Sequence, residues 1–190
     1  MPGIGMSPQE AEIYRFHRNY CYQAIGLGHH ETQLGAEQRR ALDVGCGNGV
    51  NLDVLLERGW DAEGIDPNRE QVDVLVSRGK SAAVADLEQA VAEPERRGRY
   101  LLVTMLHVIE HLSDPLALIR ATANLLAAGG VLVFETPLCC DLANRDHLFF
   151  FSGTSLYILL EKAGFFWQSH FMYVAHGHAH DNIIVLASRA

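Results

Sequence analysis

Three glycines at alternate positions follow a short apolar run in this chain. The run extends from Arg40 to Val44, and the glycines are Gly45, Gly47 and Gly49. Alternating glycines after a strand allow a tight turn and let the backbone approach a ligand without side-chain interference. A helix expected directly after them would direct free N–H groups and the positive end of its dipole at the same place. The pattern predicts a binding site for a nucleotide or a small anionic group.

Two carboxylates accompany this loop. Asp43 lies in the end of the first strand, where it can accept hydrogen bonds from a ligand ammonium group or from loop N–H groups. Asp66 ends the run 61–66 and lies 21 positions after Gly45. An acid about 20 residues on, at the tip of the second strand, is placed to bind ribose hydroxyls. Val50 stands where a G-x-G-x-x-G dinucleotide fingerprint requires its third glycine.

Histidine side chains near residue 107 offer proton transfer. His107 and His111 flank Glu110 in an H-x-x-E-H run that follows the apolar run 100–105. Imidazole titrates close to neutral pH, so it can take a proton from a hydroxyl acceptor. We predict His107 and His111 as catalytic residues, and His147 in a later loop can reach the same place. The alternative for His111 is a structural role in packing or hydrogen bonding.

The elements that must position these residues alternate between strands and helices, which is typical of a mainly parallel sheet. The expected strands are 40–44, 61–65, 81–85, 100–105, 130–136, 165–174 and 181–188. The expected helices are 8–25, 49–58, 68–78, 114–127 and 154–163, with a short helix and a loop over 88–98. The side chains expected on the core side of the second and third helices are Leu52, Leu55, Leu56, Val72, Leu75 and Val76.

Composition indicates one globular protein with a sizeable core. The chain has 190 residues, 48% hydrophobic and 20% charged, which argues against disorder. A formal net charge of −8 disfavours nucleic acid as a partner, because that binding depends on Lys and Arg. No apolar run of about 18 residues and no signal-peptide pattern is present. Four cysteines without framework spacing favour reduced thiols, so we expect a cytoplasmic protein.

The glycine loop and three later segments of the chain follow one another in the same order as in a known family. The runs 41–49, 103–115, 125–137 and 146–165 are similar to segments of class I S-adenosylmethionine-dependent methyltransferases, especially the ubiquinone-biosynthesis-type small-molecule methyltransferases. The resemblance implies an α/β, Rossmann-like, doubly wound sheet of seven mainly parallel strands with an antiparallel C-terminal hairpin. It implies a methyltransferase domain over 39–190, preceded by an N-terminal helix and lid-like segment over 1–38, in a single domain overall.

The resemblance also implies cofactor roles. Asp43, Gly45, Gly47 and Gly49 would line the methionine and ribose side of S-adenosylmethionine, and Asp66 would hold the ribose hydroxyls. The other implied contacts are Pro67 against the adenine, Asp86 near its amino group, Leu87 beside the ring, and Leu106 or His107 at the methionine end. Helix or turn capping is the alternative for both Asp66 and Asp86.

Metal binding is a second interpretation of the H-x-x-E-H run. The run matches an inverted zinc-protease signature, but its position at a strand tip beside a nucleotide-type site opposes that function. Some ubiquinone-type relatives are thought to hold a metal here with an acid-x-x-acid-His arrangement, whereas this chain has His107 at the first position. We therefore predict no metal at His107, Glu110 and His111. Histidines 176, 178 and 180 are expected to be solvated turn residues rather than a metal site.

The resemblance predicts a methyltransferase that uses S-adenosylmethionine on a small-molecule acceptor, most readily at oxygen, and releases S-adenosylhomocysteine. An NAD-dependent oxidoreductase is one rival, opposed by Val50 and by the closing hairpin. A non-catalytic cofactor- or partner-binding relative is the other, favoured by the short N-terminal segment. The sequence leaves open the acceptor, the oligomeric state, the pathway, and whether a divalent metal binds at His107, Glu110 and His111.

Overall fold

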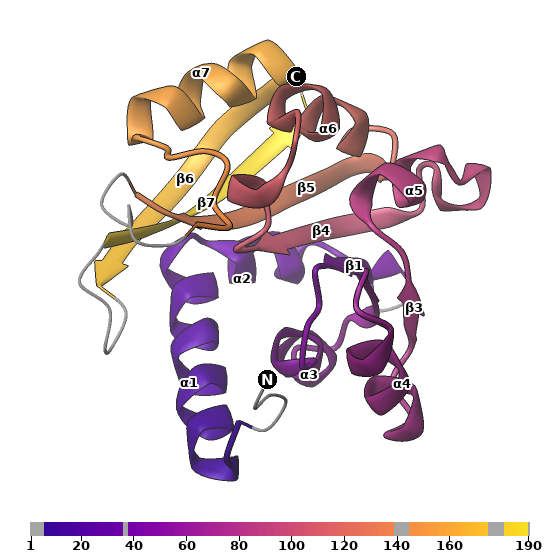
Figure 1. The fold of residues 1–190 in the computed structure, drawn as a ribbon. Coiled ribbons are helices and arrows are strands. Elements are labelled where there is room, and N and C mark those ends of the chain that lie inside the picture. The colour runs from indigo at the N-terminus through magenta and orange to yellow at the C-terminus, as the bar shows by residue number, and fades with distance from the viewer. Residues whose placement is uncertain (1–5, 36–37, 139–144, 175–180, 190) are drawn as a thin grey trace.

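The computed structural model describes residues 6–35, 38–138, 145–174 and 181–189. Within these ranges the chain forms a seven-stranded sheet in the order β3-β2-β1-β4-β5-β7-β6. The first five strands pair in parallel, and β7 pairs antiparallel with both β5 and β6. The expected doubly wound sheet with an antiparallel C-terminal hairpin is confirmed (Figure 1).

Most strand positions agree closely with those expected from the sequence, but β5 begins at Leu126 rather than at residue 130. The strands are β1 Arg40–Val44, β2 Asp61–Asp66, β3 Ala82–Val84, β4 Tyr100–Leu106, β5 Leu126–Pro137, β6 Phe165–Val174 and β7 Asp181–Arg189. The turn expected between the last two strands lies outside the described residues. Because β1 and β4 are neighbours at the centre, the order reverses between them, and their carboxyl ends border the crevice where open α/β sheets bind ligands.

Helices cover both faces of the sheet. The helices are α1 Pro8–Ala24, α2 Leu27–Thr32, α3 Val50–Glu57, α4 Arg69–Ser77, α5 Leu87–Ala92, α6 Pro115–Thr122 and α7 Gly153–Ala163, with 3-10 turns η2 Pro94–Arg96 and η3 Ile109–His111. Side chains of α1 to α4 form one core with their face of the sheet, and those of α5 to α7 form the other. Figure 1 shows the two helical layers on opposite sides of the strands.

Helix starts follow from capping side chains. Ser7, Asp86 and Ser152 each form a reciprocal capping box with the residue three positions on. Such caps satisfy N–H groups that have no partner inside the helix. Ser152 caps the last helix, and Gly164 ends that helix with φ of 85°, a left-handed value that glycine adopts readily.

Three sequence expectations about helices are wrong. Leu56 and Val76 are 43% and 52% exposed rather than part of the core. In helices this short, Leu52 with Leu55 and Val72 with Leu75 already fill the buried stripe. The helix expected to reach residue 127 ends at Thr122, because Leu126 already pairs with Tyr100 of β4.

No helix in the described part of the chain is long and apolar enough to cross a bilayer. Cys21 and Cys46 are both buried and free.

Candidate active site at the carboxyl ends of β1 and β4

The glycine loop after β1 is a close-packed turn. Gly45 has φ of 70°, and a Cβ there would lie 2.6 Å from Cγ2 of Val108, the residue that follows the β4 tip by two positions. Gly49 has φ of 82°, and its Cβ would lie 2.3 Å from Cδ2 of Leu75 on α4. Only glycine satisfies both the left-handed backbone and the absence of space. The loop therefore brings bare backbone to the crevice end of β1, as the sequence predicted.

Asp43 presents an unpaired oxygen at this loop. Its carboxylate is 1% exposed, and Oδ1 accepts hydrogen bonds from Asn51 Nδ2 at 2.8 Å and Thr104 Oγ1 at 2.7 Å. Oδ2 is buried and has no hydrogen-bond partner among the described residues. Burial raises the pKa of Asp43 to about 6, although the two donors and the charge of Arg18 oppose the rise. A buried carboxylate oxygen without a partner is costly, so this atom favours a cationic ligand.

Asp66 ties the loop to the next strand and helix. Its Oδ2 accepts from the backbone N–H of Gly47 at 2.9 Å, and its Oδ1 accepts from the N–H of Asn68 at 2.8 Å. Asn68, not Asp66, is the N-cap of α4. Each carboxylate oxygen can accept more than one hydrogen bond, so ribose binding stays compatible with these contacts. Pro67 is exposed beside it.

Asp86 and Leu87 lie after β3, the strand next to β2. Asp86 is exposed and caps α5, accepting from Gln89 N at 2.8 Å, so the capping alternative is confirmed. Leu87 is 3% exposed and belongs to the core on the α5 side of the sheet. The Ala85 N–H donates to the Asp66 carbonyl at 3.2 Å, which keeps this segment close to the β2 tip. Contacts of Asp86 and Leu87 with an adenine ring stay predictions.

His107 follows half-buried Leu106 at the tip of β4 and is held between two carboxylates. Its Nε2 lies 2.8 Å from Glu135 Oε1, and its Nδ1 lies 3.4 Å from Glu110 Oε1. Its φ is 57°, a left-handed value that is uncommon outside glycine. Burial lowers the pKa of His107, but hydrogen bonds and charges of Glu110 and Glu135 outweigh it and raise the pKa to about 9. The ring is therefore a cation at neutral pH, and it must first lose a proton before it can act as a base.

The family model described as "Methyltransferase domain" matches residues 17–169. The chain belongs to the methyltransferase domain family. A "Ubiquinone biosynthesis O-methyltransferase" of Marinobacter nauticus is 33% identical over 118 residues, which cover 59% of this chain and 50% of that protein. The protein of the same name from Alkalilimnicola ehrlichii is 32% identical over 155 residues, covering 79% of this chain and 58% of its own length. The chain thus spans only about half to three fifths of these curated relatives.

Solved structures share the fold of this methyltransferase domain. A geranyl diphosphate methyltransferase in complex with SAM superposes with a TM-score of 0.72 at 12% identity, covering 100% of this chain and 93% of that one. A SAM-dependent methyltransferase from Archaeoglobus fulgidus gives 0.68 at 18% identity, covering 94% of each chain. The fold expected from the resemblance is confirmed.

Sequence reasoning missed Glu135 on β5, the buried carboxylate that contacts His107. This carboxylate is fully buried and pairs with Arg18 of α1, while the Tyr173 hydroxyl of β6 donates to its Oε1 at 2.7 Å. Burial alone would raise the pKa of Glu135, but the charges of Arg18 and His107 hold it well below its usual range. A lone acid inside the apolar run 130–136 was the available signal. Nothing in the sequence marked Arg18 or Tyr173.

The H-x-x-E-H run does not form the helix that a zinc-protease motif needs. Glu110 and His111 lie in the single 3-10 turn η3, and His107 precedes it with a left-handed backbone. Within the described residues, the group with ligand atoms close enough to hold a metal is Glu110, His111 and His147. His107 is instead engaged between Glu110 and Glu135. Histidines 176, 178 and 180 lie outside the described residues.

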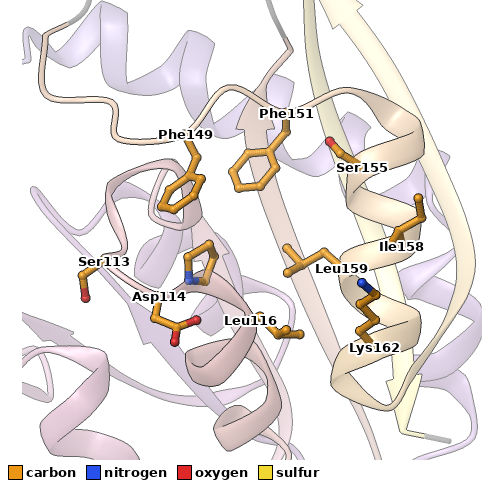
Figure 2. Close-up of a pocket in the computed structure, with 10 residues that line it drawn as sticks. Ser113, Asp114, Leu116, Phe149, Phe151, Ser155, Ile158, Leu159 and Lys162 are labelled. Carbon is orange, nitrogen blue, oxygen red and sulfur yellow. The ribbon is translucent and has the colours of Figure 1, made fainter.

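A groove of about 410 Å³ opens beside this turn, between α6 and α7. Phe149 and Phe151, from the segment that follows His147, form one wall, and Leu159 of α7 forms another (Figure 2). Lys162 and Asp114 are among its few charged residues. Such a volume and lining suit the apolar part of a small ligand. The aromatic side chains of Phe149 and Phe151 are therefore part of a defined groove.

Proposed function

We propose that this domain binds S-adenosylmethionine and transfers its methyl group to a hydroxyl oxygen of a small molecule. The family match, the glycine loop and the position of Asp66 support the cofactor, and the names of the relatives support oxygen as the acceptor atom. The buried, unpaired Oδ2 of Asp43 carries the proposal. The α-ammonium group of the cofactor's methionine moiety is a cation of the kind this atom requires.

Each side chain has a distinct task in this proposal. Asp43 would hold the ammonium group, Asp66 the ribose, and the glycine loop would let the backbone approach the methionine moiety. When bound, the cofactor supplies a methyl group on a positively charged sulfur, so the domain needs chiefly to align it with the acceptor oxygen. Proton removal from the acceptor would fall to His111 or His107. The neutral His111 ring can accept a proton at Nε2, because its Nδ1 donates to the Asp146 carbonyl at 2.9 Å.

The setting of the proposed enzyme is a reducing one. Cys21 and Cys46 are free thiols buried in the domain, which supports the cytoplasm as its location. The acidic net charge of −8 supports a small-molecule partner rather than nucleic acid.

Cofactor binding tests the proposal directly. In calorimetry, S-adenosylhomocysteine is expected to bind with micromolar or better affinity, equivalent to about 8 kcal/mol or more, while NAD gives no heat. Binding of NAD alone would contradict the proposal and favour an oxidoreductase. A panel of hydroxyl acceptors, with and without alkyl chains, then separates an enzyme from a non-catalytic relative. Failure of S-adenosylhomocysteine formation across the whole panel would favour the non-catalytic alternative.

The charge of Asp43 should make this affinity depend on pH. Because the pKa of Asp43 is raised to about 6 in the unliganded protein, the carboxylate is ionised above that value and neutral below it. An ammonium ligand prefers the ionised form, so affinity should be constant above pH 7 and weaken by about tenfold at pH 5. The stability of the unliganded fold depends on pH in the opposite direction to the affinity. The folded protein binds the Asp43 proton more tightly than the unfolded chain, so its free energy of unfolding rises as the pH falls through 6.

Titration calorimetry with S-adenosylhomocysteine at pH 5 and pH 7.5 measures the effect. Asp43→Asn should bind weakly and lose most of the pH dependence, because its side chain stays neutral at both values. An affinity of the unaltered protein that is equal at both pH values would show that Asp43 does not hold the ammonium group.

A further inference from the structure

We propose that Tyr22 of α1 and Asn51 of α3 are positioning residues for Asp43, and that they hold its carboxylate so that Oδ2 can receive the ammonium group of the cofactor. The inference rests on the proposed function. Its basis is a chain of hydrogen bonds in which the Tyr22 hydroxyl donates to Asn51 Oδ1 at 2.6 Å, and Asn51 Nδ2 donates to Asp43 Oδ1 at 2.8 Å. This chain connects the N-terminal helix to the carboxylate at the end of β1.

The direction of the hydrogen bonds follows from the charge of Asp43. An ionised carboxylate can only accept hydrogen bonds, so the nitrogen end of the Asn51 amide is the end that contacts it. The oxygen end of the same amide then needs a donor, and the Tyr22 hydroxyl supplies one. Without this hydroxyl the amide could turn and place its oxygen against the carboxylate. Tyr22 therefore fixes the orientation of Asn51, and Asn51 keeps a donor on Asp43.

The network occupies one of the two Asp43 oxygens. Oδ1 accepts from Asn51 Nδ2 and also from Thr104 Oγ1, which lies 2.7 Å away. Asn51 Nδ2 lies 3.2 Å from the same Thr104 oxygen, so the amide contacts both partners. Oδ2 has no hydrogen-bond partner among the described residues. Two donors on Oδ1 fix the carboxylate before the ligand arrives, so less conformational freedom is lost on binding.

The members of the chain are shielded from water. Tyr22 and Thr104 are fully buried, and Asn51 is 9% exposed. The Arg58 guanidinium covers the Tyr22 ring, with its central carbon 5.6 Å from the ring centre. Burial raises the pKa of Tyr22 well above its usual range, so the hydroxyl keeps its proton and remains a donor. Because water cannot replace a lost partner here, removing one group leaves the next one unpaired.

Anchoring α1 on the sheet is the other role that a buried Tyr22 can have. Phenylalanine keeps the ring and its packing against Arg58, so Tyr22→Phe removes the hydroxyl alone. If Tyr22 only anchors the helix, this variant loses stability but keeps the cofactor affinity and its dependence on pH. If Tyr22 positions Asp43 through Asn51, both the affinity and its dependence on pH change.

Titration calorimetry with S-adenosylhomocysteine at pH 7.5 tests the chain. Tyr22→Phe is expected to weaken binding about two- to tenfold, and Asn51→Leu about ten- to a hundredfold, since the second change removes a hydrogen bond to a charged group. In the Asn51→Leu background, adding Tyr22→Phe should change the affinity by less than about twofold, because the hydroxyl no longer orients an amide. Equal effects of Tyr22→Phe in the two backgrounds would overturn the inference.

The pH profile separates positioning from anchoring. Burial raises the pKa of Asp43 to about 6, and the Asn51 donor opposes that rise because it favours the ionised form. Loss of the donor in either variant should therefore move the weakening of affinity to higher pH. The same shift should appear in the unliganded protein when the Asp43 carboxyl carbon is titrated by NMR. The other charged and titratable groups that act on Asp43 are Arg18, Asp66 and Cys46, and both variants keep them.

Tyr100→Phe is the matched control. Its side chain is buried and its hydroxyl donates to Glu63, at the end of β4 away from the crevice. This variant should lose stability in urea unfolding but keep the affinity and pH profile of the unaltered chain. Unchanged affinity and pH profile in Tyr22→Phe and Asn51→Leu would refute this inference alone. Absence of binding by the unaltered chain would refute the proposed function. An unchanged NMR titration of Asp43 in both variants would overturn the inference without any cofactor.

Discussion

Replacing Arg18 by alanine is expected to lower the free energy of unfolding by about 3–5 kcal/mol, the usual loss when one partner of a buried ion pair is removed. Arg18 is 5% exposed and Glu135 is fully buried, so neither charge has water as an alternative partner. After the change Glu135 keeps His107 and the Tyr173 hydroxyl but loses its guanidinium contact. Urea unfolding followed by circular dichroism measures the difference.

Arg15 on the same helix is the matched control. It pairs with Glu57, but the two side chains are 42% and 46% exposed. Solvent screens such a pair, and its removal costs about 0–1 kcal/mol. Arg18→Ala and Arg15→Ala should therefore differ by several-fold in their effect on the urea midpoint. Equal effects of the two variants on the urea midpoint would show that the buried Arg18–Glu135 contact contributes no more to stability than an exposed ion pair.

The geometry of the loop after β1 could be predicted from the sequence. Glycine type and spacing determine the turn after β1, and the acids Asp43 and Asp66 sit at fixed offsets from it, so pattern and structure agree. The strands are also short, apolar and bounded by turn residues, which is why most of their limits were predicted. Information of this kind is carried by residues close together in the chain.

The cluster around Glu135 depends on contacts that no local pattern records. Arg18 and Glu135 are 117 positions apart, and Tyr173 reaches the same carboxylate from the last hairpin. The H-x-x-E-H run shows the consequence: its spacing suggested that His107, Glu110 and His111 act together. The chain brings His147 to Glu110 and His111 from a distant loop and draws His107 toward Glu135. Tertiary packing, and not spacing along the chain, therefore determines which carboxylate or imidazole each of these histidines contacts.

Replacing His107 by alanine is expected to reduce turnover by about 10²–10⁴-fold if this ring removes the acceptor proton, with cofactor affinity nearly unchanged. Its two carboxylate neighbours complicate the result, because the ring is also the cation that separates Glu110 from Glu135. Loss of that cation alone would destabilise the fold and lower activity indirectly. Turnover and unfolding must therefore be measured on the same variants, with an acceptor that the unaltered protein methylates.

His107→Lys separates the two roles. Lysine keeps a positive charge between the carboxylates but offers no imidazole, so it should recover part of the stability lost in His107→Ala. If His107 is the base, His107→Lys should stay as slow as His107→Ala despite its better stability. If turnover recovers together with stability, the positive charge is what the reaction requires, and proton removal belongs to His111. Full activity of His107→Ala would exclude this ring from the reaction. Alignment of cofactor and acceptor would then account for the rate of methyl transfer.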